Sequence, residues 1–122
     1  MNTQAIDFEH LNTYLGGEVS LIAEVFGLFK NQVEMWSKMM NADADDDSWA
    51  SVMHSLKGSA RAVGAARLAG LCAHGEELVG ASNSPIRRAA HIDEIRFEID
   101  RALIEIGRWE YRQTLASMRS GA

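Results

Sequence analysis

Apolar residues recur at spacings of three and four along most of this chain, which is the pattern of helices that bury one face. One such stripe, within residues 18–41, consists of Ile22, Val25, Phe26, Phe29, Val33, Trp36 and Met40. Another starts near residue 86 and continues through Ile92, Ile95, Ile99, Ala102, Leu103 and Ile106. A single proline and abundant alanine, leucine, methionine and glutamate also favour helix. The sequence therefore predicts an all-α protein.

Glycine and proline mark where these helices end and begin. We expect helices at about residues 7–15, 18–41, 48–63 and 66–79, and a last one from residue 86. Gly16 and Gly17 end the first helix, Gly64 ends the third, and Pro85 starts the last. The third helix follows an acidic connector that contains Asp43, Asp45, Asp46 and Asp47. These carboxylates are expected to cap free N–H groups rather than bind a cation, because the ligand order of an EF-hand loop is absent.

The last predicted helix is longer than the other helices can cover. If the helix continues to Met118, it is about 50 Å long, against about 35 Å for the second helix. Its end must then protrude, bend back or break near Gly107. We expect Trp109, Tyr111 and Leu115 to cover the end of the bundle rather than meet another protein. A chain of 122 residues is one domain, with a core at about 6–106 and a helical extension at about 107–119.

The third helix has two faces of different character. Its apolar stripe, about 100° wide, consists of Trp49, Val52, Met53, Leu56, Ala60 and Val63. Small and cationic residues, namely Ala50, Ser51, Lys57, Gly58 and Arg61, fall within roughly 60° of His54 on the other side. His54 is therefore expected to point to water.

An exposed imidazole beside a lysine suits a group that accepts and returns phosphoryl. The neutral ring is a nucleophile, and its unperturbed pKa near 6.5 leaves much of it unprotonated at neutral pH. Lys57, three residues on, can stabilise the roughly two negative charges of a phosphoryl group. Gly58 costs about 1 kcal/mol of helix stability relative to alanine, which indicates that another protein's backbone approaches beside the ring.

The segment from His54 to Ala65, with the pattern His-x-x-Lys-Gly-Ser-Ala-x-x-x-Gly-Ala, is similar to the signature of histidine phosphotransfer (HPt) domains. Similar sequences occur in the first domain of chemotaxis histidine kinases. Residues 67–72 and 76–78 also resemble the next HPt helix, and the resemblance spans about residues 6–106. It implies an antiparallel four-helix bundle, here with a short N-terminal helix. It also implies phosphohistidine at His54, a neighbouring lysine at Lys57 and a clearing glycine at Gly58.

Three further residues of this helix have expected roles. Ser51 and Arg61 are expected to contact the docking partner, although a charged residue at position 61 departs from the small or neutral ones often found there in the family. Ser59 falls about 140° from His54 and is expected at a helix–helix contact.

The resemblance implies a phosphorelay protein that needs no cofactor of its own. It takes phosphoryl from a receiver-domain aspartate or from a histidine kinase and passes it to another receiver, which supplies Mg²⁺. No metal site is expected, because His10, His74 and His91 lie on separate helices and Cys72 lies about 160° from His74. No P-loop follows Gly58, so we expect no nucleotide site and no enzyme activity.

Composition limits the partners and the compartment. A net charge of -5 and a pI near 5.3 argue against nucleic acid and anionic membranes. No apolar run approaches the length of a membrane span, and residues 1–4 begin no signal sequence. Cys72 has no disulfide partner. We therefore expect a cytoplasmic protein, and a closed bundle predicts a monomer.

Two alternatives stay open at this point. The dimerising helical hairpin of a sensor kinase also displays a phosphorylatable histidine, but there an acidic residue and, a turn later, a proline commonly follow it. Ser55 and Gly58 do not fit that pattern. A cofactor-binding or adaptor bundle would make His54 incidental, and it leaves the small, basic patch around the ring unexplained.

Overall fold

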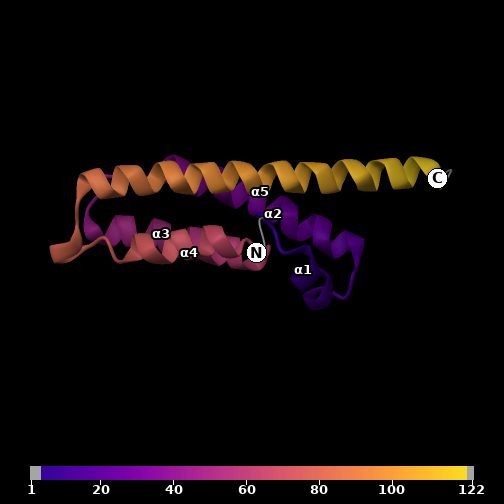
Figure 1. Cartoon of the computed structure of the whole chain (residues 1–122), viewed down its shortest axis with the longest axis horizontal. Coiled ribbons are helices and arrows are strands. Elements are labelled where there is room, and N and C mark those ends of the chain that lie inside the picture. Colours follow the sequence, from indigo (N-terminus) through magenta and orange to yellow (C-terminus); the bar gives the residue numbers. More distant parts are fainter. Residues whose placement is uncertain (1–3, 121–122) are drawn as a thin grey trace.

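Five α-helices and one short 3-10 turn make up most of residues 4–120, the part of the chain that the computed structural model describes (Figure 1). They are α1 (Phe8–Tyr14), α2 (Val19–Met39), α3 (Asp46–Ala62), α4 (Ala66–Glu76), η1 (Gly80–Ser82) and α5 (Pro85–Arg119). These residues contain no strand. Residues 1–3 and 121–122 lie outside the described part. The first range begins the segment that was considered as a signal sequence, and the second ends the predicted domain.

Four of the helices form a closed ring in which α2 packs on α3, α3 on α4, α4 on α5, and α5 on α2. Short connections make successive helices antiparallel, as in up-and-down bundles (Figure 1). The predicted antiparallel four-helix bundle with a short N-terminal helix is confirmed.

The predicted stripes supply the core. Its largest fully buried apolar side chains are Trp49, Phe26, Phe29, Ile6, Leu11, Met53, Leu56, Leu68, Ile95, Ile106 and Val33. Each contributes about 1.5 to 3 kcal/mol by leaving water, so the bundle is stabilised mainly by these faces. The whole predicted stripe of α3 is buried, which fixes the opposite side of that helix toward solvent.

Side-chain caps set the helix boundaries. Asp45 accepts a hydrogen bond from the Ser48 backbone N–H at 2.7 Å, so α3 begins two residues before the predicted start. Ser84 accepts one from the Arg87 backbone N–H at 3.2 Å, and Pro85 occupies the first turn of α5 as predicted. The predicted fourth helix is too long, because α4 ends at Glu76 and the chain turns extended by Val79.

α3 and α4 pack closely at their facing surfaces. A Cβ atom at Gly75 would lie 2.5 Å from Met53 Sδ, so glycine lets the two helices approach. The Trp49 indole Nε1–H donates to the Gly75 carbonyl at 2.7 Å. These contacts fix the relative position of the two helices.

α5 continues unbroken through Gly107 and projects beyond the other helices (Figure 1). Of the three predicted outcomes, protrusion is therefore correct. Trp109 covers the core as predicted, and its ring meets Phe26 edge to face with centroids 5.2 Å apart. Tyr111 does not: it is exposed, because it lies on the side of α5 that faces away from the bundle. Leu115 is half-buried.

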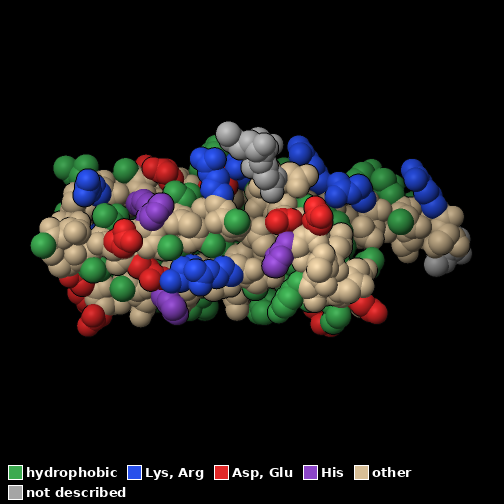
Figure 2. Space-filling model, turned by 60° about the horizontal axis from the view of Figure 1, so that its bottom comes forward, with side chains coloured by type: hydrophobic (Ala, Val, Ile, Leu, Met, Phe, Trp, Pro, Cys, Tyr) green, Lys and Arg blue, Asp and Glu red, His purple; other side chains and the backbone are tan. Residues whose placement is uncertain are grey.

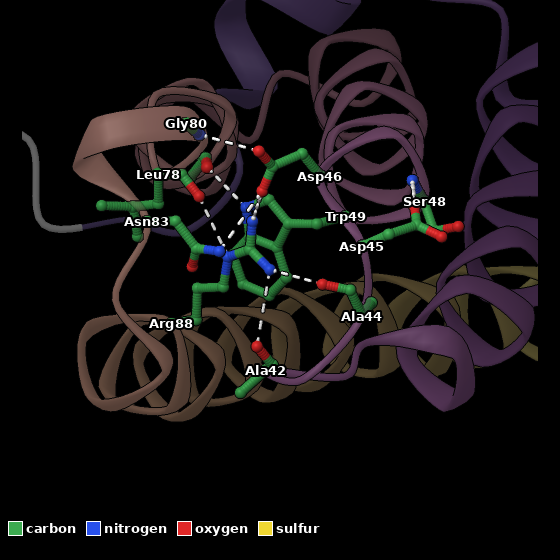
Figure 3. Close-up of polar contacts among 11 residues, drawn as sticks. Ala42, Ala44, Asp45, Asp46, Ser48, Trp49, Leu78, Gly80, Asn83 and Arg88 are labelled. Atoms are coloured by element: carbon green, nitrogen blue, oxygen red, sulfur yellow. Dashed lines mark hydrogen bonds and ion pairs between the residues drawn. The ribbon is translucent and has the colours of Figure 1, made fainter.

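The sequence analysis missed a buried arginine at the opposite end of the bundle (Figure 3). Arg88 is fully buried, and its guanidinium lies 4.7 Å from the centre of the Trp49 ring. Its Nε donates to the Leu78 carbonyl at 2.9 Å, and Nη1 donates to the Ala44 carbonyl at 2.8 Å. Nη2 lies 2.7 Å from an Asp46 carboxylate oxygen. One side chain of α5 thus ties together the connections that precede α3 and follow α4.

We predict that Arg88→Met lowers the free energy of unfolding by about 3 kcal/mol, because it removes a buried charge from partners that stay in place. Urea unfolding followed by circular dichroism measures this change. The control is Arg87→Met, at an exposed position one residue away, which should change stability by less than about 0.5 kcal/mol. Equal effects of the two substitutions would contradict the role of Arg88.

Candidate functional site

His54 projects from the solvent-facing side of α3, as the sequence predicts. Its side chain is 76% exposed. It lines a shallow surface groove of about 520 Å³ together with Asp47, Ala50, Ser51, Ser55 and Glu76. Figure 2 shows histidine side chains on the surface of the molecule with acidic and basic side chains nearby. The ring is therefore carried by a rigid helix and is accessible to a large partner.

Glu76 is a site residue that the sequence analysis did not assign. It belongs to α4, and its Oε1 atom lies 3.4 Å from His54 Nδ1 and 2.7 Å from Lys57 Nζ. The only signal in the sequence was that residues 76–78 belong to the segment that resembles the HPt pattern. The contact with α3 depends on how the two helices pack.

Lys57 lies on the His54 side of α3, and its charge is already paired. Its side chain is only 14% exposed, and its ammonium group contacts the same Glu76 oxygen that faces the His54 ring. The expected charge beside the imidazole is therefore present, and a carboxylate of α4 holds it in position.

The electrostatics of this cluster keep Glu76 ionised. The Lys57 ammonium group, 2.7 Å from Oε1, is the main cause that lowers the pKa of Glu76 below its ordinary value, and His54 acts in the same direction. A carboxylate facing Nδ1 favours the tautomer with its proton on that nitrogen. Nε2 then carries the lone pair.

Gly58 is exposed on the same face. A Cβ atom at this position would meet no atom within 4 Å, so the fold of this chain does not require a glycine. Glycine weakens a helix by about 1 kcal/mol, and no contact within the described chain accounts for it at this position.

Of the two other predicted partner contacts, Ser51 lies beside His54 and Arg61 lies elsewhere. Ser51 is exposed and lines the His54 groove. Arg61 is exposed but lines a different depression of about 350 Å³ near α1, with Asp7 and His10. Ser59 is buried, as predicted for a helix contact, and its hydroxyl donates to Gln32 Oε1 of α2 at 2.7 Å.

An apolar row on α2 was not predicted. It consists of the exposed residues Leu21, Leu28, Met35 and Met39. Gln32, whose side chain contacts Ser59 of α3, lies about 40° from Leu28 around α2, so the row borders α3. The spacing of seven between its first three members was a signal in the sequence, but the stronger stripe of α2 masked it.

The remaining candidate ligands are not grouped. Burial raises the pKa of the Cys72 thiol to about 12, so it stays protonated. His91 Nε2 contacts the Leu71 carbonyl. Within residues 4–120, no three histidine, cysteine or acidic side chains gather in a way that could hold a metal ion.

Residues 8–109 match the sequence profile of the Hpt domain. This chain belongs to the Hpt domain family. The histidine phosphotransferase ShpA from Caulobacter crescentus has a similar crystal structure, with a TM-score of 0.74 and 29% sequence identity. The match covers 93% of this chain and 98% of ShpA. No curated protein sequence is significantly similar to the chain.

Membership of the Hpt family decides the general role. The protein is a phosphorelay carrier, and its partners belong to two-component systems. None of the helices in the described range is long and apolar enough to cross a membrane.

The Glu76 contacts predict a dependence of stability on pH. Because folding lowers the pKa of Glu76 from its ordinary value of 4.5, its contacts stabilise the fold fully above that value. The contribution is lost as pH falls through the lowered pKa. The stability difference between the wild-type chain and Glu76→Gln should shrink as the pH falls below about 4.

Urea unfolding at each pH measures this difference, with Glu77→Gln, an exposed neighbour, as the control. A difference that grows as the pH falls below about 4 would contradict the direction of the shift.

Proposed function

We propose that His54 is the residue of this Hpt domain that carries the phosphoryl group. The observation that supports it is a 76% exposed imidazole with a carboxylate at Nδ1, 3.4 Å away, which leaves Nε2 as the nucleophile. The helix under the ring is anchored by a fully buried apolar stripe, so the ring is presented on a rigid element.

The transfer step follows from these atoms. The Nε2 lone pair attacks the phosphorus of an acyl phosphate on a receiver-domain aspartate. The new P–N bond forms as the P–O bond to the aspartate breaks, and the aspartate leaves as a carboxylate. The ring keeps its Nδ1 proton and becomes positively charged, and the Glu76 carboxylate stabilises that charge. The reverse reaction uses the same atoms, so the free energies of the partners set its direction.

Lys57 serves the phosphoryl group through its charge. In the free protein its ammonium group is held by Glu76 at 2.7 Å, on the same flank of α3 as His54. A phosphoryl group on His54 brings roughly two negative charges to this flank. The Lys57 ammonium group offsets part of that charge, and it is already positioned for this by Glu76.

The receiver domain docks over α2 and α3. Gly58 leaves room for its backbone beside the ring, and Ser51 contacts it from the groove. The exposed apolar row of α2 borders this face. It supplies the apolar contacts of the interface, because the His54 groove is lined mainly by polar and small residues. Arg61, near the C-terminal end of α3, makes a contact at the edge of the docked surface.

The protein supplies no cofactor and hydrolyses no nucleotide in this proposal. Mg²⁺ belongs to the receiver, and an upstream histidine kinase provides the phosphoryl group directly or through a receiver. We place the protein in the cytoplasm, where such partners meet. The sensor-kinase hairpin is not favoured, because one chain closes the four-helix ring by itself.

We predict that His54→Gln abolishes phosphoryl acceptance from a phosphorylated receiver domain and leaves the helical content unchanged, because only the nucleophile is removed. Transfer of radiolabelled phosphate and circular dichroism measure the two properties. His74→Gln, at an exposed position on α4, should accept phosphate normally. Normal transfer to the His54 variant would reject this residue as the acceptor.

Gly58→Glu is predicted to weaken receiver docking at least tenfold, because it fills the space beside the ring with a charged side chain. Titration calorimetry with a receiver domain measures the affinity. The matched control is Gly70→Glu on α4, since Gly70 is also an exposed helical glycine with open space at its Cβ. Equal affinities of the two variants would mean that position 58 does not face the receiver.

A further inference from the structure

α5 exposes a second apolar row, on the side that faces away from the bundle. It consists of Ile86, Phe97, Ile104, Tyr111 and Met118, all well exposed. At 100° per residue these five positions fall within about 60° of one another around the helix. The buried residues of α5, such as Ile95, Ile99 and Ile106, lie on the opposite side. The row therefore has no partner within the described chain.

The last four members of this α5 row are spaced by seven residues. A spacing of seven supplies one of the two apolar positions in the repeat with which two helices pack along their length in a left-handed supercoil. The row continues onto the end of α5 that projects beyond the other helices (Figure 1), where α2, α3 and α4 offer nothing to cover it. Large apolar side chains that are exposed in a line along one side of a helix form a candidate interaction surface.

Charges along the α5 row change sign from one end to the other. Within about 60° of Phe97, the exposed charged residues of the first half are acidic, namely Asp93, Glu94 and Asp100. Those of the second half are basic, namely Arg108, Arg112 and Arg119. Figure 2 shows basic and hydrophobic side chains on the projecting end. Arg101, between the two halves, is paired with Glu98 of its own helix at 2.8 Å.

We propose that the α5 row packs against the α5 row of a second copy of this chain, with the two helices antiparallel. This arrangement places the acidic half of each helix along the basic half of the other. With Ile104 near the two-fold axis, Phe97 faces Tyr111 of the other copy, and Glu94 of one copy meets Arg112 of the other. Such an interface uses the same patch on both copies, as two-fold dimers do.

This dimer is compatible with phosphotransfer, although it does not rest on that function. The core of each bundle lies behind its α5, so the two bundles extend to opposite sides without collision. α5 packs on α2 and α4, and α3 lies across the ring from it. His54 of both copies therefore stays open. A closed bundle predicts a monomer, but this bundle does not bury the α5 row, which remains available to a second copy.

Sedimentation equilibrium of the full chain from about 1 to 500 µM tests the proposal, since the dimer fraction must rise with concentration. We expect a mass that approaches twice 13.5 kDa. Ile104→Glu should raise the dissociation constant at least tenfold. Leu28→Glu, at a position of α2 that is as exposed as Ile104, should leave the dissociation constant of the dimer unchanged, and so should His54→Gln. A wild-type chain that stays monomeric throughout would overturn the proposal and assign the row to a different protein.

Charge reversal tests the antiparallel register. Glu94→Arg and Arg112→Glu should each weaken the dimer several-fold, because each places like charges together at two symmetric sites. The double variant should recover the wild-type dissociation constant, since both pairs are restored with opposite polarity. A dimer that resists Ile104→Glu, that Leu28→Glu disrupts, or that the double variant does not restore would overturn the proposed interface.

Discussion

The burial of one guanidinium group fixes the end of the bundle from which the functional helix starts. A buried charge without partners costs several kcal/mol, so Arg88 is tolerated only when the carbonyls and the carboxylate around it are in place. Those partners belong to the connections before α3 and after α4. The same group lies over Trp49, whose indole N–H binds Gly75. The start of α3 and the end of α4 are therefore positioned by a single side chain of α5.

The site depends on that positioning, because its charged residues come from both helices. His54 and Lys57 are placed by the helical repeat of α3, while Glu76 reaches them from the end of α4. A small shift of α4 along α3 would separate the carboxylate from both groups. The close packing at Gly75, one residue before Glu76, limits such a shift.

Two exposed apolar rows give the molecule two sides for which we propose different roles. The row of α2 borders the helix that carries His54 and faces the proposed receiver. The row of α5 lies on the outside of the bundle, away from α3, and is the proposed contact between two copies. Because the rows are on different helices, docking of a receiver and pairing of two chains do not compete for the same surface. In these two proposals, phosphotransfer and dimerisation therefore use separate surfaces.

Local periodicity was enough to predict the helices, the buried stripes and the exposure of His54 beside Lys57 and Gly58, since these depend on residues within a few turns of one helix. It could not predict Glu76 as a neighbour of the ring, Gln32 as the partner of Ser59, or the carbonyl and carboxylate groups that Arg88 contacts in the core. Those contacts join different helices, and their geometry depends on the rotation and height of each helix in the ring. The sequence by itself determined which face each helix buries; the tertiary structure decided which residues of neighbouring helices meet, because only packing fixes those distances.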